Sequence, residues 1–338
     1  MIIVMQKGAS KEQIDHVIER IEALGYKPHP IFGEQRTIIG AIGDERGKFR
    51  LESLASVPGV EVVMPILKPY KLVGRELKTE PSIIKIGEHT VGGKEFMLVA
   101  GPCSVESREQ LITAAKAVKK AGAQYLRGGA FKPRTSPYAF QGLEEDGLKF
   151  LREASEITGL KIVTEVISRT DVNLVAKYAD VLQVGARNMT NYSLLKDLGK
   201  IDKPVMLKRG MAATVQDFLM AAEYIASEGN TEIILCERGI RTFENATRNT
   251  LDLSAVPIIK GSSNLPVIVD PSHATGKRDL IAPMSKAAVA CGADGLMIEV
   301  HPNPEEAFSD GAQSLLPDDF AKLTKELQKY LKLEGKVL

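Results

Sequence analysis

Short apolar runs alternate with amphipathic stretches along most of the chain. From residue 96 onward the runs lie at residues 96–100, 124–126, 161–166, 181–184, 205–207, 233–235, 267–269 and 295–298, with helical periodicity near 111–118, 148–151, 218–225, 280–290 and 320–330. Strands that are apolar on both faces are typical of a parallel sheet covered by helices. Eight such repeats predict a (β/α)8 barrel, also called a TIM barrel.

An open, doubly wound sheet is the alternative, and it would be expected to bind a nucleotide. No G-x-G-x-x-G sequence follows an apolar run, and residues 87–94 miss the P-loop pattern because Gly93 stands where lysine is required. The missing fingerprints favour the closed barrel.

The first 66 residues show a different pattern, βαββαβ. A strand at residues 2–5 precedes a helix whose apolar stripe includes Ile14, Val17 and Ile21. A hairpin around residues 33–35, a short helix near 49–57 and a strand at 60–64 complete it. We therefore expect a ferredoxin-like domain over residues 1–66. A linker over 67–81, which lacks sustained periodicity, and a catalytic barrel domain over 82–338 follow it.

Composition narrows the class of protein. The 338 residues are 44% hydrophobic and 26% charged, and 44 basic residues nearly balance 43 acidic ones. This balance gives no reason to expect nucleic acid or an anionic membrane as a partner. The three cysteines have no regular spacing, and neither a signal peptide nor an apolar stretch of about 18 residues is apparent. We expect a cytoplasmic protein.

Polar clusters follow the predicted strands. They lie at residues 101–104, 128–138, 185–187, 207–209, 237–238, 270–273 and 298–299. In a (β/α)8 barrel the loops after the strands form one face, which carries the active site. These clusters therefore predict a single site.

Four residues of this face are candidate metal ligands: Cys103, His273, Glu299 and Asp310. A thiolate, an imidazole and two carboxylates suit Mn, Fe, Co or Zn better than Mg or Ca. Taken singly, each has a plainer explanation, since a lone cysteine is usually core and aspartate before glycine usually marks a turn.

Basic residues are also concentrated at these strand ends. They are Arg127, Lys132, Arg134, Arg187, Lys208, Arg209 and Arg238. So many cations suit one or two substrates that carry several negative groups. Some of them can instead extend to solvent or pair with carboxylates such as Glu165 and Glu237, and Arg209 is the one most expected to do so.

Together these motifs resemble the 3-deoxy-D-arabino-heptulosonate 7-phosphate (DAHP) synthases, the first enzymes of the shikimate pathway, over the whole barrel domain. The motifs are Gly101-Pro102-Cys103-Ser104, Arg127, Lys132-Pro133-Arg134-Thr135, Gly185-Ala186-Arg187, Lys208, Arg238, Asp270-Pro271-Ser272-His273, Glu299 and Ser309-Asp310-Gly311. Any one can occur by chance, but the set is specific.

The resemblance implies a role for each position. One divalent metal ion would be bound by the four candidate ligands, and phosphoenolpyruvate by Arg127, Lys132, Arg187, Lys208 and Arg238. Erythrose 4-phosphate would face Pro133, Arg134 and Thr135, with Asp270 near its hydroxyls or aldehyde end. The family reaction joins both substrates with water and releases phosphate. Lys132 is a candidate for proton transfer, and Asp270 and His273 are the other catalytic candidates.

Other interpretations remain open. The first is a 3-deoxy-D-manno-octulosonate 8-phosphate synthase, which uses arabinose 5-phosphate; its loop typically reads Lys-Ala-Asn-Arg-Ser where this chain has Lys132-Pro133-Arg134-Thr135. The second is an inactive barrel that serves as an amino-acid sensor. The N-terminal domain either extends an oligomer interface or, as the resemblance suggests, mediates feedback inhibition by tyrosine, phenylalanine or both. The resemblance also implies a homotetramer.

Overall fold

The computed structural model describes residues 1–33, 36–43, 47–64, 69–132, 136 and 138–338. These residues form two compact units, Met1–Pro69 and Tyr70–Leu338. The division falls within the segment that the sequence analysis assigned to a linker.

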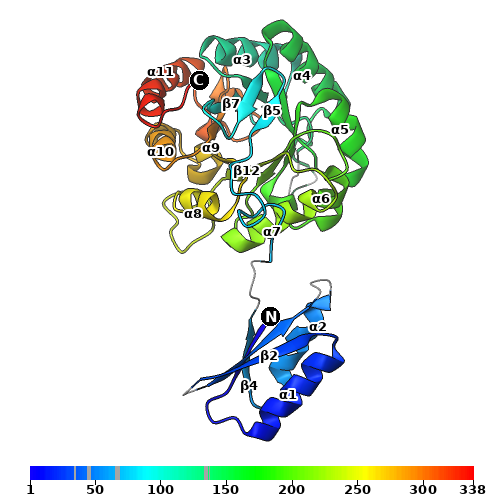
Figure 1. Ribbon diagram of the computed structural model, residues 1–338. Helices are drawn as coiled ribbons and strands as arrows, with labels where there is room; N and C mark the ends of the chain where they lie inside the picture. Colours follow the sequence, from blue (N-terminus) through cyan, green and yellow to red (C-terminus); the bar gives the residue numbers. More distant parts are fainter. Residues whose placement is uncertain (34–35, 44–46, 65–68, 133–135, 137) are drawn as a thin grey trace. The chain divides into compact units, whose positions relative to one another are not determined.

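The first unit is an antiparallel sheet packed against helices (Figure 1). Its elements are β1 (Ile2–Met5), α1 (Lys11–Ala23), β2 (Lys27–Phe32), β3 (Thr37–Ile42), α2 (Phe49–Glu52), the 3-10 turn η2 (Ser53–Ser56) and β4 (Val60–Met64). The strand order is β2-β3-β1-β4. A capping box at Ser10 starts α1, whose stripe of Ile14, Val17 and Ile21 is buried. The predicted ferredoxin-like fold is confirmed.

The second unit is a closed parallel barrel surrounded by helices (Figure 1). Its strands are β7 (Met97–Gly101), β8 (Tyr125–Arg127), β9 (Lys161–Glu165), β10 (Val181–Val184), β11 (Val205–Lys208), β12 (Ile233–Glu237), β13 (Val267–Val269) and β14 (Gly295–Glu299). The outer helices are α3 (Arg108–Lys120), α4 (Glu144–Thr158), α5 (Val172–Tyr178), α6 (Tyr192–Leu198), α7 (Val215–Ala226), α8 (Ala255–Ser262), α10 (Arg278–Ala290) and α11 (Pro317–Leu333). The predicted barrel is confirmed. None of the helices in the described ranges has the length and hydropathy needed to cross a membrane.

A short hairpin that the apolar pattern did not predict packs onto the barrel interior. It consists of β5 (Ile84–Ile86) and β6 (His89–Val91), and its apolar side chains join the interior cluster that contains Met97 and Tyr125. Both of these residues lie at the first positions of their strands, so the hairpin covers the end of the barrel opposite the active-site face. Its strands are three residues long and include Lys85, His89 and Thr90, so they contain no continuous apolar run.

Residues 70–81 connect the hairpin to the preceding unit, and part of this segment is packed against the barrel. Tyr70 and Val73 belong to the layer of apolar residues between the barrel and its helices. Ser263 donates a hydrogen bond to the Val73 carbonyl, and Arg75 Nε donates one to the Lys260 carbonyl at 2.6 Å. The few apolar residues of this charged stretch therefore hold it to the second unit.

Candidate active site

Closure of the barrel brings its last strand, β14, beside its first strand, β7. Strand β14 pairs with β7 so that Glu299 lies opposite Gly101. Gly101 has a φ of +147°, and a Cβ atom there would lie 2.2 Å from the Arg127 carbonyl oxygen. Only glycine permits this approach of the chain that leads from β7 to Cys103. The loops above the strands enclose a cavity of about 380 Å³.

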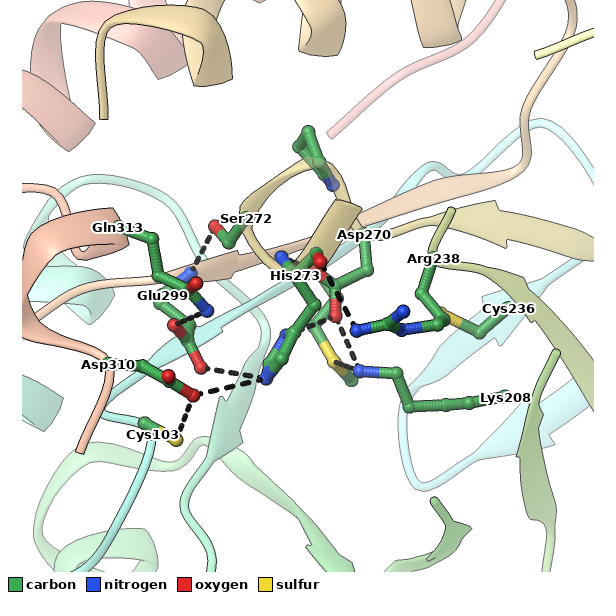
Figure 2. Close-up of polar contacts among 12 residues, drawn as sticks. Cys103, Lys208, Cys236, Arg238, Asp270, Ser272, His273, Glu299, Asp310 and Gln313 are labelled. Carbon is green, nitrogen blue, oxygen red and sulfur yellow. Dashed lines mark hydrogen bonds and ion pairs between the residues drawn. The ribbon is translucent and has the colours of Figure 1, made fainter. Parts of the chain in front are cut away.

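The four predicted metal ligands meet beside this cavity (Figure 2). One ligand atom from each of Cys103, His273, Glu299 and Asp310 lies within 4.8 Å of the others. Cys103 Sγ is 3.3 Å from Asp310 Oδ2, and His273 Nε2 is 3.1 Å from Glu299 Oε1. These separations are those of ligands around one shared ion, so the arrangement fits a single metal with S, N and O donors.

Asp270 controls the orientation of the histidine. It caps the short helix α9 (Pro271–Thr275): its Oδ1 accepts the His273 backbone N–H at 2.9 Å, and its Oδ2 contacts His273 Nδ1 at 2.7 Å. The remaining ring nitrogen, Nε2, therefore faces Glu299 and Asp310. A carboxylate on the outer nitrogen is the usual support of a metal-binding histidine. The second partner of Asp270 Oδ2 is Lys208.

Burial shapes the protonation of these groups. It raises the pKa of the Cys103 thiol to about 12, with a further contribution from the negative charge of Glu299. It lowers the pKa of His273, although Asp270 and Glu299 oppose that shift, so the ring is neutral, as metal binding requires. Asp270 is also buried, but the hydrogen bonds from His273 and the positive charge of Lys208 hold its pKa well below the usual value.

The cavity itself is strongly cationic. Seven basic side chains line it: Arg127, Lys132, Arg187, Lys208, Arg238, Arg241 and Arg248. The carboxylates in its described lining are Glu165 and Asp310. This excess of positive charge in a concave site is suited to a ligand with several negative groups.

Three of these cations contact the metal-ligand residues directly. Arg127 Nη1 donates to Glu299 Oε1 at 2.8 Å, while its Nε is buried without a partner in the described chain. Arg238 Nη2 donates to the His273 carbonyl at 3.2 Å, and burial lowers the pKa of its guanidinium. Lys132 Nζ lies 3.0 Å from Cys103 Sγ. The cationic lining and the metal-ligand cluster thus share side chains and form one site.

Other predicted residues lie elsewhere. Arg209 is absent from the cavity lining, and its guanidinium contacts Glu237 at 2.8 Å and Asp252 at 2.9 Å. This is the pairing that the sequence analysis expected of it. Pro133, Arg134 and Thr135 lie outside the described residues, so their predicted role stays a prediction.

Gln313, Arg241 and Arg248 were not among the site residues predicted from the sequence. Gln313 Nε2 donates to Glu299 Oε2 at 2.6 Å, and Arg248 Nη1 donates to Asp310 Oδ1 at 3.1 Å. Both arginines belong to the long loop after β12, where no apolar run precedes them directly. Gln313 follows Asp310 by one 3-10 turn, so its closeness to a ligand residue was the signal that was available.

A second cavity, of about 680 Å³, lies between α10 and α11 and is larger than the catalytic one. Its lining includes Lys277, Arg278, Asp279 and Lys322 and contains none of the four metal-ligand candidates. Size alone therefore does not locate the chemistry of this molecule.

The family to which the chain belongs follows from its similarity to known protein families. Residues 78–333 match the DAHP synthetase I family, and residues 1–68 match the DAHP synthase ferredoxin-like domain. The chain belongs to the DAHP synthetase I family. Its activity is accordingly that of a DAHP synthase, the enzyme of the first step of the shikimate pathway.

Individual relatives agree with this assignment. The phospho-2-dehydro-3-deoxyheptonate aldolase of Thermotoga maritima is 52% identical, with 97% of each chain covered. The crystal structure of that protein has a TM-score of 0.93 at 51% identity and covers 100% of this chain and 99% of its own. A 2-dehydro-3-deoxyphosphooctonate aldolase of Syntrophotalea carbinolica is 33% identical over 73% of this chain and 95% of its own.

The ion pair between Arg209 and Glu237 is predicted to stabilise the fold at the active-site end of the barrel. Arg209→Met leaves Glu237, whose side chain is fully buried, without its cation, and we expect the free energy of unfolding to fall by about 3–5 kcal/mol near neutral pH. Burial already raises the pKa of Glu237 against the opposing charge of Arg209. Without Arg209 the pKa of Glu237 rises further. The loss in free energy of unfolding should therefore shrink as the pH is lowered and Glu237 takes up a proton.

Urea unfolding of the variant at two pH values measures this effect. Lys200→Met, which removes a lysine that is 59% exposed, serves as the control and should change stability by less than about 0.5 kcal/mol. Equal losses in both variants, or a deficit independent of pH, would contradict the assigned role of Arg209.

Proposed function

We propose that this protein condenses phosphoenolpyruvate with erythrose 4-phosphate and water to give DAHP and inorganic phosphate, in a reaction that depends on a divalent metal ion. The observation that carries the proposal is the cluster of four ligand side chains beside a cavity lined by seven basic residues. Each half of that combination suits one need of the reaction: activation of an aldehyde and retention of two anionic substrates.

The metal would be held by Cys103, His273, Glu299 and Asp310. When bound there, a borderline divalent ion supplies a Lewis acid for the aldehyde oxygen. The chain prepares the site for it: Asp270 holds the histidine ring by its outer nitrogen, and burial keeps that ring neutral. The donor set fits Mn, Fe, Co or Zn.

Phosphoenolpyruvate would be held by the basic residues that line the cavity from several strands. Arg127, Lys132, Arg187, Lys208 and Arg238 all belong to its lining. Guanidinium groups match carboxylate and phosphate oxygens in pairs, whereas lysine supplies a compact charge. Cations fixed by the fold hold two mutually repelling anions close together without reorganising during the reaction.

Erythrose 4-phosphate would lie toward residues 133–135, and Asp270 would act near its hydroxyl or aldehyde end. The contacts of Asp270 with His273 and Lys208 support an effect on that end of the substrate through the histidine. Arabinose 5-phosphate is the alternative sugar, since octonate aldolases are among the relatives. The four-carbon sugar is favoured by the higher identity of the heptonate aldolase, 52% against 33%.

Consumption of phosphoenolpyruvate, followed by its ultraviolet absorbance, tests the proposal. With manganese present, we expect the absorbance to fall with erythrose 4-phosphate, to remain nearly constant with arabinose 5-phosphate, and to remain constant after a chelator is added. A faster fall with the five-carbon sugar would establish the octulosonate synthase instead. Undiminished activity in chelator would refute the metal requirement, and no phosphate release with either sugar would favour the inactive sensor.

Lys132 is proposed to transfer a proton during the reaction as well as to bind substrate. Its ammonium group lies 3.1 Å from the Cys103 carbonyl and 3.0 Å from Cys103 Sγ, at the junction of the metal cluster and the cavity. General acid–base catalysis typically contributes a factor of about 10²–10⁴. We therefore expect Lys132→Met to lower kcat by at least about 10²-fold.

Steady-state kinetics of Lys132→Met and Lys132→Arg separate the two roles. The arginine variant keeps the charge but cannot release a proton near neutral pH, so its kcat should also be low while its KM for phosphoenolpyruvate stays near that of the native protein. Metal content is measured in both because Cys103 is adjacent. A raised KM with unchanged kcat in Lys132→Met would mean that the lysine only binds.

The N-terminal unit is proposed to mediate feedback inhibition by tyrosine, phenylalanine or both, within a cytoplasmic homotetramer. It matches the DAHP synthase ferredoxin-like domain, and its core of residues such as Ile3, Val17 and Leu51 is formed within the unit itself. A unit with its own core can change its association without disturbing the catalytic barrel, as a regulatory domain requires.

Removal of residues 1–69 tests this regulation. The cut keeps Tyr70 and Val73, which belong to the barrel core, and a truncated DAHP synthase of Thermotoga maritima has been solved as a structure that covers 80% of this chain. We expect the full chain to be inhibited by at least one of the two amino acids and the truncated chain to remain active but insensitive. Equal inhibition of both chains would place the effector site elsewhere.

A further inference from the structure

The two carboxylates of the metal-ligand cluster are held in the same way, each by its outer oxygen. Asp310 Oδ1 accepts a hydrogen bond from Arg248 Nη1 at 3.1 Å, while Oδ2 faces Cys103 Sγ at 3.3 Å. Glu299 Oε2 accepts from Gln313 Nε2 at 2.6 Å, while Oε1 faces His273 Nε2 at 3.1 Å. Figure 2 shows Gln313 bonded to one carboxylate oxygen of Glu299 and His273 in contact with the other.

Arg248 and Gln313 are also bonded to each other, which makes them one unit. Arg248 Nη1 donates to Gln313 Oε1 at 3.0 Å. An arginine can only donate and a carboxylate can only accept, so the amide of Gln313 has one permitted orientation, with its nitrogen toward Glu299. The chain Asp310, Arg248, Gln313, Glu299 is therefore continuous and satisfied at every link.

The backbone fixes both members of this unit. Gln313 is 3% exposed, and its N–H donates to the Asp310 carbonyl, which closes one tight turn after the ligand. The Arg248 N–H donates to the Thr275 carbonyl at 2.9 Å, at the end of the helix that carries His273. At Gly276 an added Cβ would lie 2.7 Å from Arg248 Cβ, so the loop approaches this helix closely.

We propose that Arg248 and Gln313 are positioning residues for the metal centre, which bind the outer oxygens of Asp310 and Glu299 so that each carboxylate offers one oxygen to the ion. This inference rests on the metal site of the proposed function. Without the pair, each carboxylate loses the bond that fixes its outer oxygen and can turn a different oxygen, or both oxygens, inward, even though Arg127 Nη1 still contacts Glu299 Oε1 at 2.8 Å. Loss of such outer partners typically lowers metal affinity by about 10–100-fold.

The direction in which metal affinity changes when Arg248 is removed distinguishes positioning from simple electrostatics. Arg248 carries a positive charge beside a cation site, and removing it on Coulombic grounds alone should tighten metal binding. Positioning predicts the opposite. Arg241 provides the matched control, because it lies in the same loop and lines the same cavity but forms no hydrogen bond or ion pair with the ligand side chains in the described chain.

The experiment is a cobalt(II) titration of the metal-free full-length protein, with affinity measured by competition against a chelator of known strength. The thiolate charge-transfer band of bound cobalt reports the Cys103 ligand, and the visible d–d bands report coordination geometry. We expect Gln313→Leu and Arg248→Gln each to weaken cobalt binding by about 10–100-fold and to alter the d–d bands. Arg241→Gln should bind cobalt as tightly as the native protein, or slightly more tightly.

The outcomes are distinct. If Arg248→Gln and Gln313→Leu both retain native affinity and native d–d bands, the positioning role is wrong. If the native protein shows no Cys103-dependent cobalt band, the metal site itself is wrong. Circular dichroism checks folding; should Gln313→Leu fail to fold, Arg248→Gln, whose side chain is 40% exposed, still decides the matter. The double variant should lose little more than the weaker-binding single variant, because the pair acts as a unit.

Discussion

Closure of the parallel barrel by the pairing of β14 with β7 is the constraint on which the rest of this structure depends. All eight strands point the same way, so their carboxyl ends meet at one rim only when the last strand pairs with the first. The pairing sets Glu299 opposite Gly101. It brings Cys103 to 3.3 Å from Asp310, although 207 positions separate them in the chain.

Charge balance at that rim follows a simple rule. Each deeply buried carboxylate is paired with a cation: Glu299 with Arg127, Asp270 with Lys208 and Glu237 with Arg209. An unpaired buried charge would destabilise the barrel, whereas a pair is tolerated and keeps its partner oriented. Two of these three cations, Arg127 and Lys208, also line the cavity. The side chains that balance buried carboxylates are thus among those proposed to bind the anionic substrates.

Prediction of the fold succeeded where apolar runs recurred in regular alternation with helical stretches. The eight barrel strands and the ferredoxin-like sheet followed from buried runs and from a helical stripe such as Ile14, Val17 and Ile21. The hairpin β5–β6 and the packing of Tyr70 and Val73 did not. Those segments are short, and they are held by contacts with distant residues and not by a local pattern.

By itself, the sequence determined the kinds of groups available at each strand end and, through the barrel pattern, that they face one site; the four metal-ligand candidates were found in this way. Only the tertiary structure decided which of these groups contact one another. Lys208 and Arg209 are adjacent in the chain, yet one contacts Asp270 beside the histidine and the other contacts Glu237 and Asp252. Consecutive residues leave a strand end on opposite sides. Gln313 and Arg248 meet only because two loops, 65 positions apart, fold over the same rim.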